Sequence, residues 1–451
     1  MVGVTLSRWT MSYFAAALVA LVSAQSLMTL GYGFPAVPIA DPETLVLVHV
    51  ISIGWLSLLM CGALFQFVPV LVAHPIHSNT LPLPTLICLV TGLAALILGF
   101  LQLGGSVAPG IPFLALGAAF LGVGFGLVVW NLGRTLWSAR PLPLSACFVV
   151  TGLCSIAATA AFGMIFALVL GAVTNYVHLL DVTASGLPIH VIAGLGGWLT
   201  FTAMGVSYRL LAMFMLAPEP DRAGTRAALY LGTAALTVAI VGGAAAICVG
   251  ESLMIVLVVA AAFGLAAFGF YGRDIRHLYR ARRRRALELN SRMAGLALVN
   301  MAAAVILIAI LLGLGVFDRH VGAVFFLVSF GWLSGFGLAK LYKIVAFLTW
   351  LECYGPILGK VPTPRVQDLV VEPRAMKWFV IYFIAVWGAT AALLFEMPLA
   401  FRCGAGIMTI ATIAIVVQLL RIRRLVEVKS SLRLPSGAHK PRLLYSFSQR
   451  A

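Results

Sequence analysis

The sequence predicts an all-α membrane protein with twelve transmembrane helices, and three observations predict this fold class. Of the 451 residues, 62% are hydrophobic and 10% are charged, whereas soluble domains average about 45–50% apolar and about 25% charged residues. Twelve apolar stretches have the length of about 20 residues that a bilayer-crossing helix needs. The alternating pattern of outer-membrane strands is absent. This composition excludes a soluble enzyme, a disordered chain and a secreted disulfide scaffold.

The predicted spans form one polytopic membrane domain over residues 1–451. Three of them, the second, sixth and tenth, are long enough to require tilting or extension beyond the lipid. The twelve spans cover residues 11–31, 44–72, 83–103, 111–131, 146–172, 188–216, 227–249, 251–272, 293–316, 321–350, 377–395 and 402–420.

The distribution of charge predicts the orientation. Segments on the side of the two termini contain 28 of the 30 Lys and Arg residues and carry a net charge of +20, against −4 on the other side. The positive-inside rule makes the first side cytoplasmic, in the inner membrane of a bacterium, with residues 421–451 as a basic cytoplasmic tail. The basic stretch Arg273–Arg292 is expected to contact anionic lipids. No aromatic interleaving or nucleic-acid-binding module accompanies it, so we expect no nucleic-acid partner.

A threefold internal repeat is the strongest pattern in the chain. The segments GWLSLLMCGALFQFVPVL, GWLTFTAMGVSYRLLAMF and GWLSGFGLAKLYKIVAFL begin at Gly54, Gly197 and Gly331 and align without gaps. They lie in spans 2, 6 and 10, so the repeat predicts three pseudo-symmetric four-helix units of the same orientation, at about residues 10–131, 146–272 and 293–420. This is a parallel repeat about an axis along the membrane normal, rather than an inverted one.

Three positions downstream of each Trp recur in the repeat. A small residue follows after seven positions, and it is expected to let helices approach closely. An aromatic and a long polar residue follow after ten and eleven, where interfacial anchors are expected. The small residues are Gly62, Gly205 and Ala339; the aromatic residues are Phe65, Tyr208 and Tyr342; the polar residues are Gln66, Arg209 and Lys343.

Four histidines are the main candidates for ligands. His49, His178, His190 and His320 are predicted to lie toward the outer side, within or beside spans. Ionisable residues within a span are functional candidates, and neutral imidazole binds haem iron and copper. For His49 the alternative is a hydrogen bond between helices, and for His178 and His320 it is an ordinary interfacial position. Uniform α-helical geometry places His190 and His320 on nearly one face, with His49 about 200° away.

Two further histidines, His74 and His77, are predicted to lie in a cytoplasmic loop. Their i, i+3 spacing is compatible with a metal site, but Pro75 separates them. Simple helix-end polarity is the alternative interpretation for this pair.

The segments HVISIGWLSLLMCGALFQFVPVL, HVIAGLGGWLTFTAMGVSYRLL and KLYKIVAFLTWL resemble the haem-copper oxidase subunit I-like superfamily. Within it, the chain is most similar to atypical members such as the NnrS type of membrane haem protein, which is linked to denitrification. The resemblance covers about residues 10–420. It implies haem b with His49 as axial ligand, and it implies His190 as a ligand of haem or copper. His320 is a further candidate for the cofactor, and His178 for a metal.

The departures from that superfamily argue against a proton-pumping oxidase. Span 10 has no His-x-His pair, span 7 has no pair of histidines, and we expect no carboxylates or lysines within spans to form a proton channel. The sequence therefore predicts a haem-binding membrane protein with a role in electron transfer or nitric-oxide chemistry and a respiratory-chain redox partner. The alternatives are a cofactor-free carrier or channel and an assembly factor for a respiratory complex. No residue is assigned a catalytic role.

Overall fold

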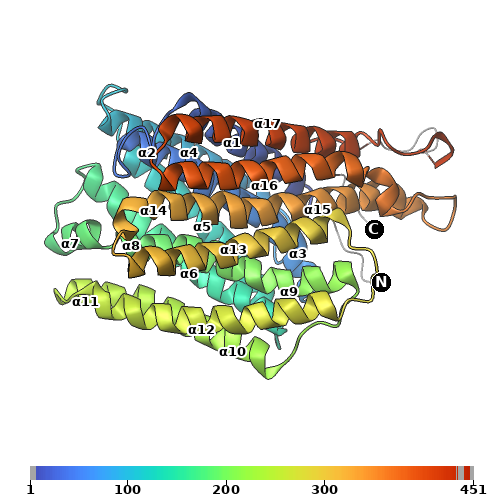
Figure 1. Ribbon diagram of the computed structural model, residues 1–451, viewed down its shortest axis with the longest axis horizontal. Helices are drawn as coiled ribbons and strands as arrows, with labels where there is room; N and C mark the ends of the chain where they lie inside the picture. The colour runs from blue at the N-terminus through green and yellow to red at the C-terminus, as the bar shows by residue number, and fades with distance from the viewer. Residues whose placement is uncertain (1–6, 433, 435–440, 447–451) are drawn as a thin grey trace. The chain divides into compact units, whose positions relative to one another are not determined.

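The computed structural model describes residues 7–432, 434 and 441–446, and within them it confirms an all-helical protein with twelve helices long and apolar enough to span a membrane (Figure 1). Several spans are built from successive helical segments. The spans are α1 (Thr10–Leu30), α2–η1–α3 (Pro42–His49, Val50–Ser57, Leu58–Leu71), α4 (Pro82–Leu103), α5 (Phe113–Ser138), α6 (Leu144–Leu170), α8–η2–α9 (Leu187–Val191, Ile192–Phe201, Thr202–Met215), α10–η3–α11 (Ala223–Thr237, Val238–Gly242, Gly243–Cys248), α12 (Leu253–Arg280), α13 (Leu289–Gly313), α14–η4–α15–η5 (Phe317–Phe326, Leu327–Ser334, Gly335–Tyr354, Gly355–Ile357), α16 (Glu372–Leu394) and α17 (Pro398–Arg423).

Two helices run well past the ends that the apolar pattern predicted. Helix α5 continues to Ser138 and α12 to Arg280, seven and eight residues beyond the predicted ends. The last turn of α12 contains His277 and Arg280, and cations are favourable at a helix C-terminus. The polar ends of these helices therefore remain helical although their side chains leave the apolar region. A short helix, α7 (Val177–Ser185), lies in the connection before span 6.

Each copy of the Gly-Trp-Leu motif lies in a π-helical segment. Trp55 is in η1, Trp198 in η2 and Trp332 in η4, and all three side chains are fully buried. A π-helix closes each turn with an i→i+5 hydrogen bond, so it holds more residues per turn than an α-helix. The phase between the histidines was calculated for α-helical geometry up to each Trp, and it remains a prediction.

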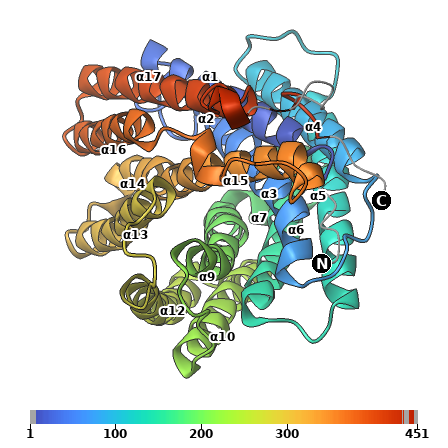
Figure 2. The ribbon, with the colours of Figure 1, turned by 90° about the vertical axis from the view of Figure 1, so that its right-hand side faces the viewer.

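The chain divides into two compact units, residues 1–62 with 287–451 and residues 63–286. In the first unit, α1 packs on α17 and on η1, α16 packs on α17, and α13 packs on α15 and η4. In the second unit, α5 packs between α4 and α6, and α10 packs along α12. The pairs α16–α17 and α10–α12 lie side by side in both views (Figures 1 and 2).

The C-terminal tail of the first unit packs against the start of α1. The backbone N–H of Ser446 donates to the carbonyl of Arg8 at 3.0 Å, and the rings of Trp9 and Tyr445 lie 6.2 Å apart. The guanidinium of Arg8 stacks over both rings, with its Cζ 5.1 Å from the Trp9 centroid and 5.4 Å from the Tyr445 centroid. The two ends of the described chain therefore contact each other, and they lie on the same side of the helix bundle, as expected for an even number of spans.

The small positions of the repeat do permit close helix contact. A Cβ atom added to Gly62 would lie 2.6 Å from Cβ of Tyr13, and one added to Gly205 would lie 2.3 Å from Cβ of Phe148. Ala339 is completely buried. These contacts confirm the prediction made from the small residues.

The prediction for the aromatic positions is wrong. Phe65, Tyr208 and Tyr342 are buried in the protein, with at most 3% of their surface exposed, so they are not interfacial anchors. The polar positions of the second and third copies form ion pairs instead. Arg209 pairs with Glu219, and Lys343 pairs with Glu288 at 2.7 Å.

Candidate functional site

His49 lies at the junction between α2 and the π-helical segment η1. Helix α2 starts at Pro42 after Asp41, whose carboxylate accepts the Glu43 N–H at 2.9 Å as an N-cap. One helix turn before the junction, the carbonyl oxygen of Leu45 lies 2.7 Å from Nδ1 of His49. Because a carbonyl only accepts hydrogen bonds, Nδ1 of His49 carries a proton and donates it to this carbonyl.

His190 occupies the corresponding place before the second π-helical segment, η2. Its Nδ1 atom lies 3.1 Å from the carbonyl oxygen of Thr159 on α6, so it likewise carries a proton and donates it. The ring of Phe166 lies 5.4 Å away, and a Cβ atom on Gly163 would lie 3.3 Å from Cε1 of the imidazole. The imidazole therefore packs closely against α6 at a position where a larger residue would crowd it.

Both histidines have the arrangement that metal-ligating imidazoles usually show. In such ligands one ring nitrogen donates to a backbone carbonyl or carboxylate, which orients the ring, and the other nitrogen binds the metal. Both side chains are half-buried. The structure thus places His49 and His190 as imidazoles oriented by backbone carbonyls within spans, His49 in the first compact unit and His190 in the second.

The other two candidate histidines lie in more open surroundings. His178 is exposed on α7, with its ring 5.4 Å from the ring of Tyr176. His320 is half-buried near the start of α14, close to Glu396, which pairs with Arg319. These positions favour the interfacial interpretation for both residues.

The candidate histidines differ in what they could bind. Among the described residues, no group of three or more His, Cys, Asp or Glu side chains is arranged to hold a metal ion. Copper bound by a protein needs several protein ligands, as in the His₂Cys sites of electron-transfer proteins. Haem iron requires only axial ligands from the protein because the macrocycle supplies the others. A single imidazole such as His49 can serve as a haem ligand, but it does not by itself make a copper site.

The loop with His74 and His77 is held by hydrogen bonds that need no metal. Nδ1 of His74 lies 2.9 Å from the carbonyl oxygen of Pro75, and the N–H of His77 donates to Oγ1 of Thr135 at 2.9 Å. Asn131 exchanges two hydrogen bonds of 2.9 Å with the backbone of Ser78. The structure therefore favours hydrogen bonding between this loop and α5 over a metal site.

A lysine within a span corrects the expectation that the spans contain none. Lys340 lies in α15, is only 4% exposed, and places its Nζ atom 5.3 Å from the centroid of the Phe336 ring. The sequence KLYKIV inside an apolar span was a sufficient signal, because a charge at that depth is costly and marks a functional candidate.

Buried polar atoms also collect between α1 and α17. The side chain of Gln25 is completely buried, and neither of its amide atoms has a hydrogen-bond partner. One turn along α1, Oγ1 of Thr29 lies 3.4 Å from Oγ1 of Thr409, and the buried Oγ1 of Thr412 on α17 also lacks a partner. Such atoms are normally satisfied by an internal water or a ligand.

No protein-family model matches the chain, and no curated protein matches it significantly. A functional assignment therefore depends on the geometry of these sites.

Proposed function

We propose that the chain is a multi-pass haem-binding protein of a bacterial inner membrane, with both termini cytoplasmic and His49 as the principal axial ligand. The observation that carries this proposal is the 2.7 Å contact between Nδ1 of His49 and the carbonyl of Leu45. That contact orients an imidazole inside a span, directly at the start of a π-helical segment. π-Helical turns occur frequently at functional sites.

The chain's own residues would bind and orient the group. Nε2 of His49 would bind the haem iron, and the Leu45 carbonyl orients the ring for that bond. The haem would be b-type, because the sequence has no C-x-x-C-H motif for covalent attachment. When bound, haem supplies one-electron redox chemistry and an iron atom that can bind diatomic gases. We place the function in electron transfer or nitric-oxide chemistry, with a respiratory-chain redox partner and without proton pumping.

His190 is the second proposed ligand. Its Nδ1 atom is held by the Thr159 carbonyl, and Gly163 lets the ring pack closely against α6. Because it lies in the other compact unit, we assign it no shared geometry with His49. The resemblance to haem-copper oxidases favours a second haem or copper for this residue.

The absorption spectrum of the purified protein tests this proposal. We expect a Soret band, together with α and β bands on reduction, and we expect His49→Ala to abolish or shift at least one set of bands. His74→Ala is the matched control, because it removes a histidine whose ring is held by a loop carbonyl, and it should leave the spectrum unchanged. A folded preparation that remains colourless after incubation with haemin would exclude haem binding.

A cofactor-free carrier is the second candidate, and the buried polar atoms between α1 and α17 favour it. Unpartnered polar groups within a membrane bundle mark paths for ions or polar substrates. If the protein is colourless, Gln25→Leu should abolish uptake of a polar solute or ion into proteoliposomes without unfolding the protein. Copurification with respiratory-complex subunits in the absence of haem would instead support an assembly role.

A further inference from the structure

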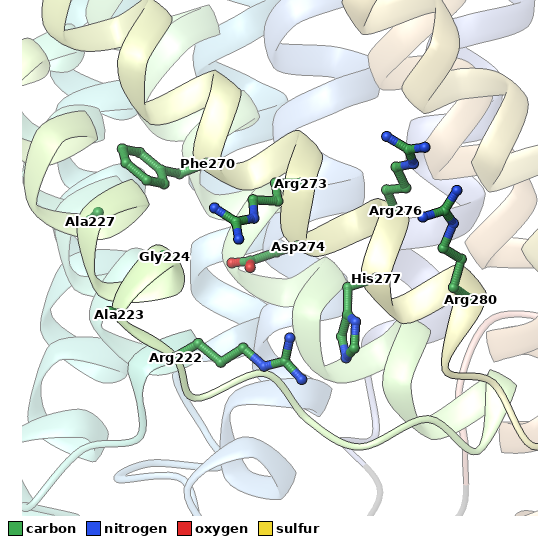
Figure 3. Close-up of a pocket in the computed structure, with 10 residues that line it drawn as sticks. All are labelled: Arg222, Ala223, Gly224, Ala227, Phe270, Arg273, Asp274, Arg276, His277 and Arg280. Carbon is green, nitrogen blue, oxygen red and sulfur yellow. The ribbon is translucent and has the colours of Figure 1, made fainter.

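A basic cavity lies in the second compact unit, where α12 ends and α10 begins (Figure 3). Its volume is about 700 Å³. The charged and titratable residues that line it are Arg222, Arg273, Asp274, Arg276, His277 and Arg280. With His277 neutral, these side chains give the cavity wall a net charge of +3.

Helix periodicity and packing place four arginines in the lining of one cavity. Arg273, Arg276 and Arg280 have i, i+3 and i+7 spacing, so they lie on one face of α12. Arg222 precedes α10, and its side chain extends toward His277 of α12 (Figure 3). All four side chains are exposed, and among the described residues none of their guanidinium groups forms an ion pair. Their charge is therefore available to a ligand.

Asp274 forms a rigid part of the wall. The residue is 5% exposed, and its Oδ2 atom accepts hydrogen bonds from Thr225 at 2.8 Å and from Tyr208 at 3.1 Å. Tyr208 and Thr225 thereby hold α12 against α9 and α10, and the spacing of the arginines is set before any ligand binds. The carboxylate is also turned toward these hydroxyls, which limits its neutralisation of the arginines.

The position of the cavity along α12 indicates that it lies at the depth of the lipid headgroups. Before Arg273, α12 is apolar and faces outward, with exposed side chains at Ile255, Val258 and Phe263 among others. The helix then becomes basic over its last two turns. An acyl chain could lie along the exposed apolar face while its phosphate group enters the cavity, as in other basic headgroup sites.

We propose that this cavity is a binding site for a phosphate-bearing anion at the membrane interface. Several guanidinium groups around one cavity match the oxygens of a phosphate, which arginine binds through charge-assisted and often bidentate hydrogen bonds. The phosphate has two sources, the headgroup of an anionic phospholipid and a soluble phosphate. This site does not depend on the proposed haem, because it involves none of the candidate haem ligands.

Binding to the delipidated full-length protein in a neutral detergent distinguishes the two sources. The probes are short-chain phosphatidylglycerol, short-chain phosphatidylcholine and inorganic phosphate, and the readout is the dissociation constant from native mass spectrometry or thermal shift. For a lipid site, phosphatidylglycerol should bind at least about tenfold more tightly than the other two probes. For a soluble ligand, inorganic phosphate should bind as tightly as the lipid. In both cases the affinity should fall as salt is added.

Two kinds of variant test whether the anion binds in this cavity. Arg276→Gln and Arg280→Gln should each weaken binding by about tenfold. Arg226→Gln is the matched control, because Arg226 lies on α10, pairs with Asp221 at 3.1 Å and does not line the cavity. Ala227→Trp keeps every charge but fills the cavity, and it should also abolish binding. Equal binding of all probes by wild type, or equal losses in Arg226→Gln and the cavity variants, would overturn the proposal.

Discussion

The indole N–H of Trp55 donates a 2.7 Å hydrogen bond to Oγ of Ser334, 279 positions away in the chain. Trp55 is the second residue of the first Gly-Trp-Leu-Ser motif, and Ser334 is the fourth residue of the third copy. Ser334 in turn donates to the carbonyl of Ser329 at 2.6 Å, within the same π-helical segment. The first and third copies of the motif are therefore joined by a buried chain of hydrogen bonds.

This relationship predicts that Ser334→Ala destabilises the protein. The buried indole N–H of Trp55 would lose its acceptor, which costs about 1–3 kcal/mol of unfolding free energy. A double-mutant cycle with Trp55→Phe separates the hydrogen bond from the loss of packing, and we expect a coupling energy of about 1 kcal/mol. Thermal or denaturant unfolding in detergent gives these values. Strictly additive effects of the two substitutions would show that the bond contributes nothing.

The close helix contact at Gly205 predicts that even one added methyl group is destabilising. In Gly205→Ala the new Cβ would lie 2.3 Å from Cβ of Phe148 and 2.9 Å from the Ser145 carbonyl oxygen. Overpacking of this kind lowers the free energy of unfolding by about 1–3 kcal/mol. Gly269→Ala is the control, since nothing lies within 4 Å of the added atom and the residue is also within a helix. It should be neutral or stabilise the protein by up to about 1 kcal/mol. Equal unfolding midpoints for the two variants would contradict this prediction.

The sequence predicted the twelve spans because apolar length is a sufficient signal for a membrane helix. The helix ends at Ser138 and Arg280 were missed because a helix continues after its apolar residues stop. The close contacts at Gly62 and Gly205 were predicted correctly from residue size. The buried positions of Phe65, Tyr208 and Tyr342 were not, because an aromatic near a helix end serves equally well as an anchor or as core.

The surroundings of His49 and His190 could be determined only from the folded structure. His49 contacts a carbonyl four residues away, but His190 contacts Thr159 on a different helix, and no local pattern predicts that pairing. The π-helical segments were missed because an α-helical period was assumed throughout. The cavity likewise joins Arg222 to α12 across about 50 residues of sequence, and only packing brings them together.

The buried ion pair at the third polar repeat position predicts a large effect of neutralisation. Nζ of Lys343 lies 2.7 Å from Glu288, and these side chains are only 15% and 9% exposed. Glu288 also accepts hydrogen bonds from Gln367 at 2.8 Å and Asn290 at 3.0 Å. The substitution Glu288→Gln should lower the free energy of unfolding by about 3–5 kcal/mol, because the largely buried cation of Lys343 loses its counterion.

The control for Glu288 is the exposed pair of Arg226 and Asp221, whose side chains are 58% and 67% exposed. Asp221→Asn should change stability by no more than about 1 kcal/mol. Chemical denaturation of both variants in the same detergent measures the difference between their free energies of unfolding. A Glu288→Gln protein as stable as Asp221→Asn would show that the pair is not stabilising.

The carboxylate of Glu427, just beyond α17, predicts a loss of stability in acid. Burial opposes its ionisation, but Arg421 and Arg374, each 2.5 Å from Oε1, outweigh burial and hold the pKa of Glu427 below its ordinary value of 4.5. A lowered pKa contributes stability that is present above about pH 4.5 and is lost as the pH falls through the value of the folded state. Glu427→Gln should therefore lower the melting temperature at pH 7 and reduce the decline of the melting temperature as the pH falls from about 5 to about 3. An identical pH profile for wild type and Glu427→Gln would show that the two arginines do not stabilise the ionised carboxylate.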